Sequence, residues 1–252
     1  MTTRCNAIAA AIVGSAIMFA PPATAVDGEI LIDQPKVNAG GITPGDAPGF
    51  PATLSRPGRY KLTGNLKVPA GKNGIEVTQD DVTIDLNGFT ISSNPPGQAA
   101  SGIVSTLSEG VLRVTGGTIT GFQGYAIRKV SGRGVVENMR ILSTGHNLSL
   151  PADSRVRNST IANGGSLGIM CPARCLIEHN IVTGNTGAGV ALQGGGGVVL
   201  GNVIVGNGLA AIQSSVNRTG YGNNVLLGNG SGGQVSGLVY PLHPNVCDPA
   251  CP

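Results

Sequence analysis

Between residues 158 and 229 the chain repeats one phrase four times: Asn158-Ser-Thr-Ile-Ala-Asn163, Asn180-Ile-Val-Thr-Gly-Asn185, Asn202-Val-Ile-Val-Gly-Asn207 and Asn224-Val-Leu-Leu-Gly-Asn229. Both asparagines of the phrase recur every 22 residues. The apolar runs between them are short and rich in Val and Ile, which favours β-strands over helices. Strands repeating at this period are typical of a β-solenoid, in which each repeat forms one turn.

The asparagine columns have a physical role in such a solenoid. Successive coils of parallel strands stack about 4.8 Å apart, so equivalent residues lie above one another. An Asn side chain at a tight turn can bond the local backbone and also the equivalent Asn of the next coil. The sequence therefore predicts an asparagine ladder, formed by Asn158, Asn180, Asn202 and Asn224.

Residues 1–25 have the pattern of a signal peptide. Arg4 precedes an apolar run over residues 7–20, and Ala23-Thr24-Ala25 is a small-residue cleavage pattern. The run has about 14 residues, whereas a membrane span needs roughly 20. We therefore expect cleavage after Ala25 and a bacterial protein that is secreted or periplasmic, with no membrane span in the mature chain.

The composition excludes several classes of protein. Charged residues make up 12% of the 252 residues and hydrophobic ones 40%, which excludes a highly charged disordered chain. The formal net charge is +3, and the basic residues are not gathered with aromatic platforms, so we expect no nucleic-acid partner. Seven basic residues between Arg113 and Arg157 leave a preference for an anionic polymer open.

Four cysteines form two closely spaced pairs, Cys171 with Cys175 and Cys247 with Cys251. An even number of cysteines in an exported chain predicts disulfides, and pairing within each local loop is the simplest arrangement. A zinc site built from both pairs is the alternative. The pairs are far apart in the sequence and the compartment is oxidising, so we expect disulfides, no metal ion and no cofactor.

The first coils carry the most specific phrases: Pro57-Gly-Arg-Tyr-Lys-Leu-Thr-Gly-Asn65, Gly74-Ile-Glu-Val77 and Asp81-Val-Thr-Ile-Asp-Leu-Asn-Gly-Phe-Thr-Ile91. With the repeats, they make residues 56–230 resemble the exported right-handed parallel β-helix proteins of the pectin-lyase-like superfamily. The resemblance implies an all-β, single-stranded right-handed parallel β-helix of about seven coils with N- and C-terminal caps. It implies no particular reaction, because lyases, hydrolases, epimerases and adhesins share this fold.

The expected organisation has four parts. They are a signal peptide at 1–25, an N-terminal extension or cap at 26–55, the β-helix at 56–236, and a C-terminal tail or cap at 237–252.

One candidate site combines an acid, a base and an imidazole. Glu137, Arg157 and His179 immediately precede ladder positions, so stacking would place them about 4.8 Å apart. With Arg128 they could transfer protons on a sugar ring, as a metal-independent lyase or epimerase requires. The alternative is a surface ion-pair column that keeps the coils in register. Neither the carboxylate cluster of a calcium site nor the carboxyl pair of a hydrolase is evident.

A second candidate site is basic and lies near the loop of residues 146–153, where the period is interrupted. Its members are Lys129, Arg133, Arg140 and His146. Loops that protrude from a solenoid often carry binding residues, so we expect contact with an anionic sugar, the alternative being a solvated face. The sequence thus predicts a monomer that contacts extracellular or cell-envelope polysaccharide. A lyase or epimerase, and a structural or adhesive surface protein, are the alternatives.

Overall fold

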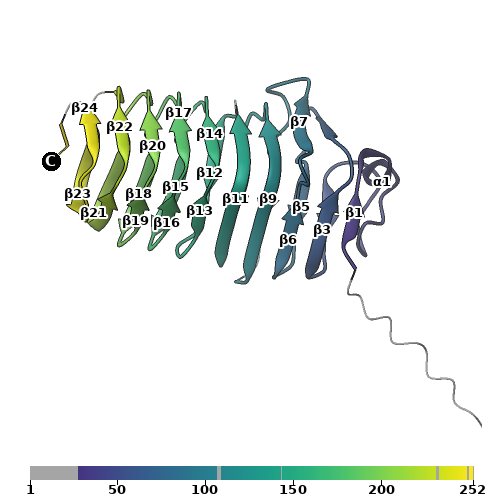
Figure 1. Cartoon of the computed structure of the whole chain (residues 1–252). Helices are drawn as coiled ribbons and strands as arrows, with labels where there is room; N and C mark the ends of the chain where they lie inside the picture. The colour runs from purple at the N-terminus through teal and green to yellow at the C-terminus, as the bar shows by residue number, and fades with distance from the viewer. Residues whose placement is uncertain (1–27, 107–108, 143, 231–232, 249, 252) are drawn as a thin grey trace, which may run out of the picture.

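The structure is a computed structural model that describes residues 28–106, 109–142, 144–230, 233–248 and 250–251. The predicted signal peptide, residues 1–25, lies outside this part. Figure 1 shows strands stacked side by side from β1 (Ile30–Ile32) at one end to β24 (Val246–Asp248) at the other. All their pairings are parallel, which confirms the predicted all-β parallel β-helix.

Each coil contributes strands to three sheets, here named A, B and C in chain order. Sheet A contains β2 (Ala52–Leu54), β5 (Ile75–Val77), β8 (Ile103–Ser105), β10 (Tyr125–Lys129), β12 (His146–Ser149), β15 (Ile169–Ala173) and β18 (Val190–Gly195). Sheet B contains β1, β3 (Gly58–Leu62), β6 (Val82–Asp85), β13 (Arg155–Arg157), β16 (Leu176–Glu178) and β19 (Val198–Leu200). Sheet C contains β4 (Leu66–Pro69), β7 (Thr90–Asn94), β14 (Thr160–Ala162), β17 (Ile181–Thr183), β20 (Val203–Val205), β22 (Val225–Leu227) and β24.

Four long strands turn a corner of the solenoid and belong to two sheets. β9 (Val111–Thr120) and β11 (Arg133–Leu142) pass from sheet B into sheet C. β21 (Ile212–Gly222) and β23 (Val235–Pro241) pass from sheet A into sheet B.

The described part of the chain forms about nine turns, so the predicted count of seven is wrong. The asparagine phrase is absent from the earliest turns, and their length differs from 22 residues, since Ile75 pairs with Ile103. β24 lies beyond residue 236 and still pairs with β22. The predicted limits at residues 55 and 236 stay predictions, because paired strands occur on both sides of each.

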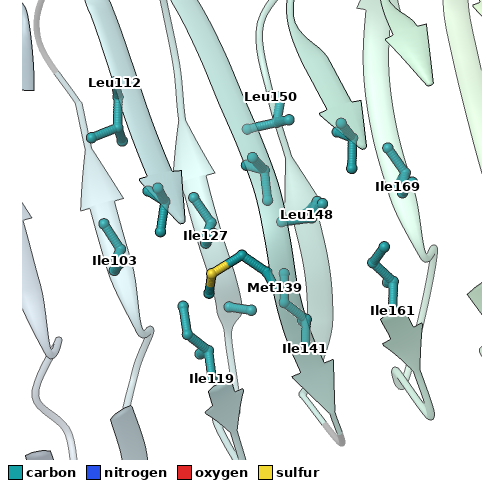
Figure 2. Close-up of a cluster of buried hydrophobic side chains, with 14 of the residues drawn as sticks. Ile103, Leu112, Ile119, Ile127, Met139, Ile141, Leu148, Leu150, Ile161 and Ile169 are labelled. Carbon is teal, nitrogen blue, oxygen red and sulfur yellow. The ribbon is translucent and has the colours of Figure 1, made fainter. Parts of the chain in front are cut away.

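The core is built from stacks of inward-facing apolar side chains. Ile103, Ile127, Leu148 and Ile169 occupy equivalent positions of successive sheet A strands and are almost fully buried. Figure 2 shows this stack beside the sheet C side chains that close the interior. Alternate residues of each strand point outward, so every coil presents its polar positions in register with those of its neighbours.

A short helix lies beside β1 at the N-terminal end (Figure 1). This helix, α1 (Gln34–Ala39), begins where the Asp33 carboxylate accepts a hydrogen bond from the backbone N–H of Lys36 at 2.8 Å. Its Val37 is fully buried in the core. Within the described residues, no helix has the length and apolar character that crossing a membrane requires.

The predicted ladder is confirmed at three of its four positions. The side-chain amide of Asn180 donates to the Asn202 oxygen at 3.0 Å, and that of Asn202 donates to Asn224 at 3.1 Å. The ladder continues to Asn245, which accepts from Asn224 at 2.9 Å.

The prediction is wrong at Asn158, whose side chain is exposed. The backbone N–H of Ser159 donates to Asn180 instead, at 3.0 Å.

The turn that follows Asn158 explains this difference. Arg157 pairs with Glu178, so this turn advances by 21 residues, one fewer than the repeat, and Asn158 falls one place before the ladder. That place is a corner with left-handed backbone, where Asn158 has φ of 50° and His179 has φ of 56°. Asn and Gly adopt this conformation at little cost, so an Asn suits the corner as well as the ladder.

Both predicted disulfides are present. The Cα atoms are 6.4 Å apart in the Cys171–Cys175 pair and 5.6 Å apart in the Cys247–Cys251 pair. Each pair closes on itself, which leaves no thiolates for the alternative zinc site.

Candidate functional site

A hollow of about 430 Å³ lies on the outer face of sheet B and is lined mainly by arginines. We call it the arginine groove. Its charged members are Arg113, Arg133, Glu137, Asp153, Arg155, Arg157 and Arg174. They come from β9, β11, β13 and the turns that precede β13 and β16.

Strand alternation explains why so many charges gather on this face. Leu112, Val114 and Val136 point into the core and are buried. Their neighbours Arg113 and Glu137 therefore point outward, and parallel pairing places them on adjacent strands.

Glu137 lies at the centre of the groove between two arginines. Its carboxylate accepts hydrogen bonds from Arg113 Nη1 and, at 2.7 Å, from Arg157 Nε. The Glu137 side chain is only 10% exposed. Burial by itself would raise the pKa of Glu137, but the hydrogen bonds from Arg157 and Arg113, together with their charges, hold that pKa below its ordinary value. Glu137 therefore stays ionised and fixes two guanidinium groups, which makes it a poor proton donor.

Two further ion pairs lie at the edges of the groove. Arg174 binds Asp153 through two hydrogen bonds, with Nε–Oδ1 at 2.8 Å and Nη2–Oδ2 at 2.7 Å. Arg155 Nε lies 3.4 Å from an oxygen of Glu178. Among the described residues, Arg133 has no carboxylate within 4.0 Å. Five arginines thus face three carboxylates, so the groove carries an excess of positive charge.

The predicted stacking of Glu137, Arg157 and His179 is confirmed for the first two residues and wrong for the third. Glu137 pairs with Arg157 in register, but Arg157 pairs with Glu178. His179 occupies the left-handed corner one place further on, where its ring lies against Gly201. The shortened turn that displaces Asn158 displaces His179 for the same reason.

Arg128 is also separate from this group. It lies exposed on sheet A, with its guanidinium carbon 5.2 Å from the ring centre of Tyr125. The structure therefore does not assemble the four residues predicted for proton transfer, and their catalytic role stays a prediction.

The predicted basic group divides among three faces. Arg133 lies on sheet B and Arg140 on sheet C, because β11 turns a corner between them. His146 is on sheet A, where its ring stacks on Tyr125 with the ring centres 4.8 Å apart.

Lys129 is 2% exposed, which places it out of reach of a surface ligand. Burial lowers the pKa of Lys129, and the charges of Asp80, Glu109 and Asp81 oppose this. The four basic residues do not form one patch.

The sequence analysis overlooked Arg113, Asp153, Arg155 and Arg174 as a group. Their alternation with buried Val and Leu could have indicated a common outer face for Arg113 and Arg155. Asp153 and Arg174 lie in turns, and their position depends on turn lengths that the period of 22 misstates.

The outer face of sheet A offers a smaller hollow, of about 200 Å³, lined in part by Arg128, Ser149 and Met170. Across the described residues, no cluster of three or more His, Cys, Asp or Glu side chains is arranged to hold a metal ion.

Comparisons with known proteins agree with this geometry. The family model for the right-handed beta helix region matches residues 60–237. A search of curated proteins found no match.

Among solved structures, the A-module of the mannuronan C-5 epimerase AlgE4 from Azotobacter vinelandii is similar at 16% identity, with a TM-score of 0.53 over 75% of this chain and 68% of that one. The periplasmic alginate epimerase AlgG has 12% identity and a TM-score of 0.38 over 77% and 69% of the two chains. The Dettilon tailspike protein gp208 has 14% identity and a TM-score of 0.35 over 75% and 60%.

The fold and the outward-facing polar columns define a right-handed parallel β-helix protein. The family model covers more than half of the chain, so the protein belongs to the right-handed beta helix family. The likeness to the AlgE4 module supports the fold.

Proposed function

We propose that this protein is an extracytoplasmic β-helix protein that binds an acidic polysaccharide in the arginine groove. The observation that carries the proposal is the gathering of five arginines against three carboxylates around a hollow of about 430 Å³. Arginine binds carboxylates and sulfates through two parallel hydrogen bonds, which adds direction to the attraction between charges.

Rigid presentation of these arginines supports the proposal. Arg113 and Arg157 are held by Glu137, and Arg174 is held by Asp153. A guanidinium that is already ordered loses less side-chain entropy when a ligand binds. Arg133, which has no close carboxylate in the described part of the chain, has its donors available for an anion.

The two disulfides support a location outside the cytoplasm, because such bonds persist in oxidising compartments. The AlgE4 module, which shares the fold, is named for an epimerase of mannuronan. We propose binding rather than proton transfer, since His179 lies outside the groove and Glu137 is held ionised. A lyase or epimerase, and a structural or adhesive protein, are the competing functions that the experiment tests.

The test is affinity electrophoresis and calorimetry of the purified protein with alginate, polygalacturonate and neutral dextran, at low and high salt. We expect both polyuronates to bind, dextran not to bind, and affinity to fall as salt rises, because added ions screen the charges. Absorbance near 235 nm, followed in the same samples, reports lyase activity.

Two variants of strand β11 make the test specific to the groove. Arg133→Gln removes one charge from sheet B, and Arg140→Gln removes one from sheet C. Loss of one arginine–carboxylate contact of about 1.4 kcal/mol would weaken binding about tenfold for Arg133→Gln. Arg140→Gln should bind as the wild type does. Equal weakening in both variants, or no polyuronate binding at low salt, would overturn the proposal.

A further inference from the structure

Four arginines of the groove occur once per coil on successive coils. Arg113 belongs to β9, Arg133 to β11, Arg155 to β13, and Arg174 to the turn before β16. Neighbouring coils are about 4.8 Å apart, so the four arginines mark evenly spaced levels along the axis of the solenoid.

These arginines also alternate between two columns. Arg113 pairs with Val135, and Val135 pairs with Arg155, so Arg113 and Arg155 share one column two coils apart. Arg133 and Arg174 lie two residues before this column in their own coils, near the corner between sheets A and B. Asp153 occupies that outer column in the coil between them. The arginines therefore form a zigzag along the axis.

A flat polysaccharide chain can have the same symmetry. In an extended 1,4-linked chain with equatorial linkages, each pyranose ring is rotated by half a turn relative to the last. An acidic group on every ring then points to alternate sides of the chain. The advance per ring is close to the separation of two stacked coils.

We propose that the arginine groove binds four consecutive rings of a flat, two-fold, 1,4-linked acidic polysaccharide that lies along the solenoid axis over sheet B. One ring lies on each coil, and its acidic group meets that coil's arginine. This inference rests on the proposed function and adds to it the shape, direction and length of the ligand.

The residues between the arginines favour one register of the ligand. A shift by one coil would bring an acidic group toward Asp153 in the outer column and another toward Val135 in the inner column. The first contact is repulsive and the second offers no hydrogen bond. Val135 and Leu176 also line the groove and give the faces of the sugar rings an apolar surface.

The test is calorimetry of the purified protein with β-1,4-linked oligomannuronates of two to six rings. The affinity should rise with each ring up to four and then change little. Two controls have four rings each. Tetra-α-galacturonate carries the same charge, but its axial linkages shorten and buckle the chain, so it should bind at least about tenfold more weakly. Neutral cellotetraose should not bind.

Arg174→Gln gives the sharpest variant, because Arg174 lies at the last of the four levels. It should bind tetramannuronate about as weakly as the wild type binds the trimer, while affinity for the dimer is unchanged. The exposed Arg174–Asp153 pair adds little to stability, so the variant should fold, and Arg140→Gln serves as the control of equal charge.

Two results would overturn the axial register. They are a tetramer that binds no better than the dimer, and tetragalacturonate that binds as well as tetramannuronate. In either case polyuronate binding itself would stand. If no uronate of any length binds, the proposed function fails together with this inference.

Discussion

Asn202 and Asn158 occupy the same place in the sequence repeat and different places in the structure, which allows a direct test of the ladder. Asn202 is 1% exposed. Its side-chain oxygen accepts hydrogen bonds from the backbone N–H and the side-chain amide of Asn180, at 2.8 and 3.0 Å. Its own amide donates to the carbonyl of Ile177 at 2.9 Å and to Asn224 at 3.1 Å. Asn158 is exposed and holds a left-handed corner.

Replacement of each residue by Gly should therefore give unequal results. Asn202→Gly leaves the backbone N–H of Asn180 without its partner, and a buried unpaired group costs about 1–3 kcal/mol. The further lost hydrogen bonds contribute about 1 kcal/mol each, so we expect the free energy of unfolding to fall by about 3 kcal/mol or more. Asn158→Gly should change it by less than about 1 kcal/mol, because Gly adopts positive φ readily.

Guanidinium unfolding followed by circular dichroism measures both variants against the wild type. Asn202→Leu is a further variant that fills the space and keeps water from replacing the lost amide. Equal, small effects at Asn202 and Asn158 would refute the argument that the ladder satisfies buried polar groups. A large effect at Asn158 would refute the assigned register.

Two further predictions concern the disulfide of the sheet A–B turn and the acid stability of the groove. Joint replacement of Cys171 and Cys175 by Ala should lower the free energy of unfolding by about 2 kcal/mol, the chain-entropy value for so short a loop, and guanidinium midpoints that match the oxidised wild type would contradict it. The pKa of Glu137 is lower in the folded state than its ordinary value, so its contribution to stability is present above that value and is lost as the pH falls through the folded-state pKa. Glu137→Gln should therefore be less stable than the wild type at neutral pH and should lose less stability between about pH 5 and pH 1. Parallel pH curves for the two proteins would show that Glu137 does not contribute in this way.

The error at Asn158 and the error at His179 have one physical origin. A corner with left-handed backbone and the ladder place after it are adjacent, and Asn suits both. When one turn loses a residue, the asparagines still align in the sequence while their roles change. The alignment then places His179 above Arg157, whereas strand pairing places Glu178 there. A difference of one residue moves a side chain to another environment, because strand neighbours face opposite ways.

The groove shows the same dependence on corners. Arg133 and Arg140 are seven residues apart in β11, yet they lie on sheets B and C. Arg113 and Arg174 are far apart in the sequence and line one hollow. Clusters of basic residues in the sequence are therefore a poor guide to charge clusters on a β-helix, because each coil distributes its residues over three faces.

The sequence by itself determined the class of fold, the ladder from Asn180 to Asn224 and the two local disulfides. These features depend on short-range patterns: β-branched runs, a fixed period and close cysteine spacing. The tertiary structure decided the number of turns, the identity of the residue at each ladder place and the composition of the arginine groove. Those features depend on the exact length of every turn, since each turn sets the register of its coil, and small changes in that length are not visible in a repeat read at one average period.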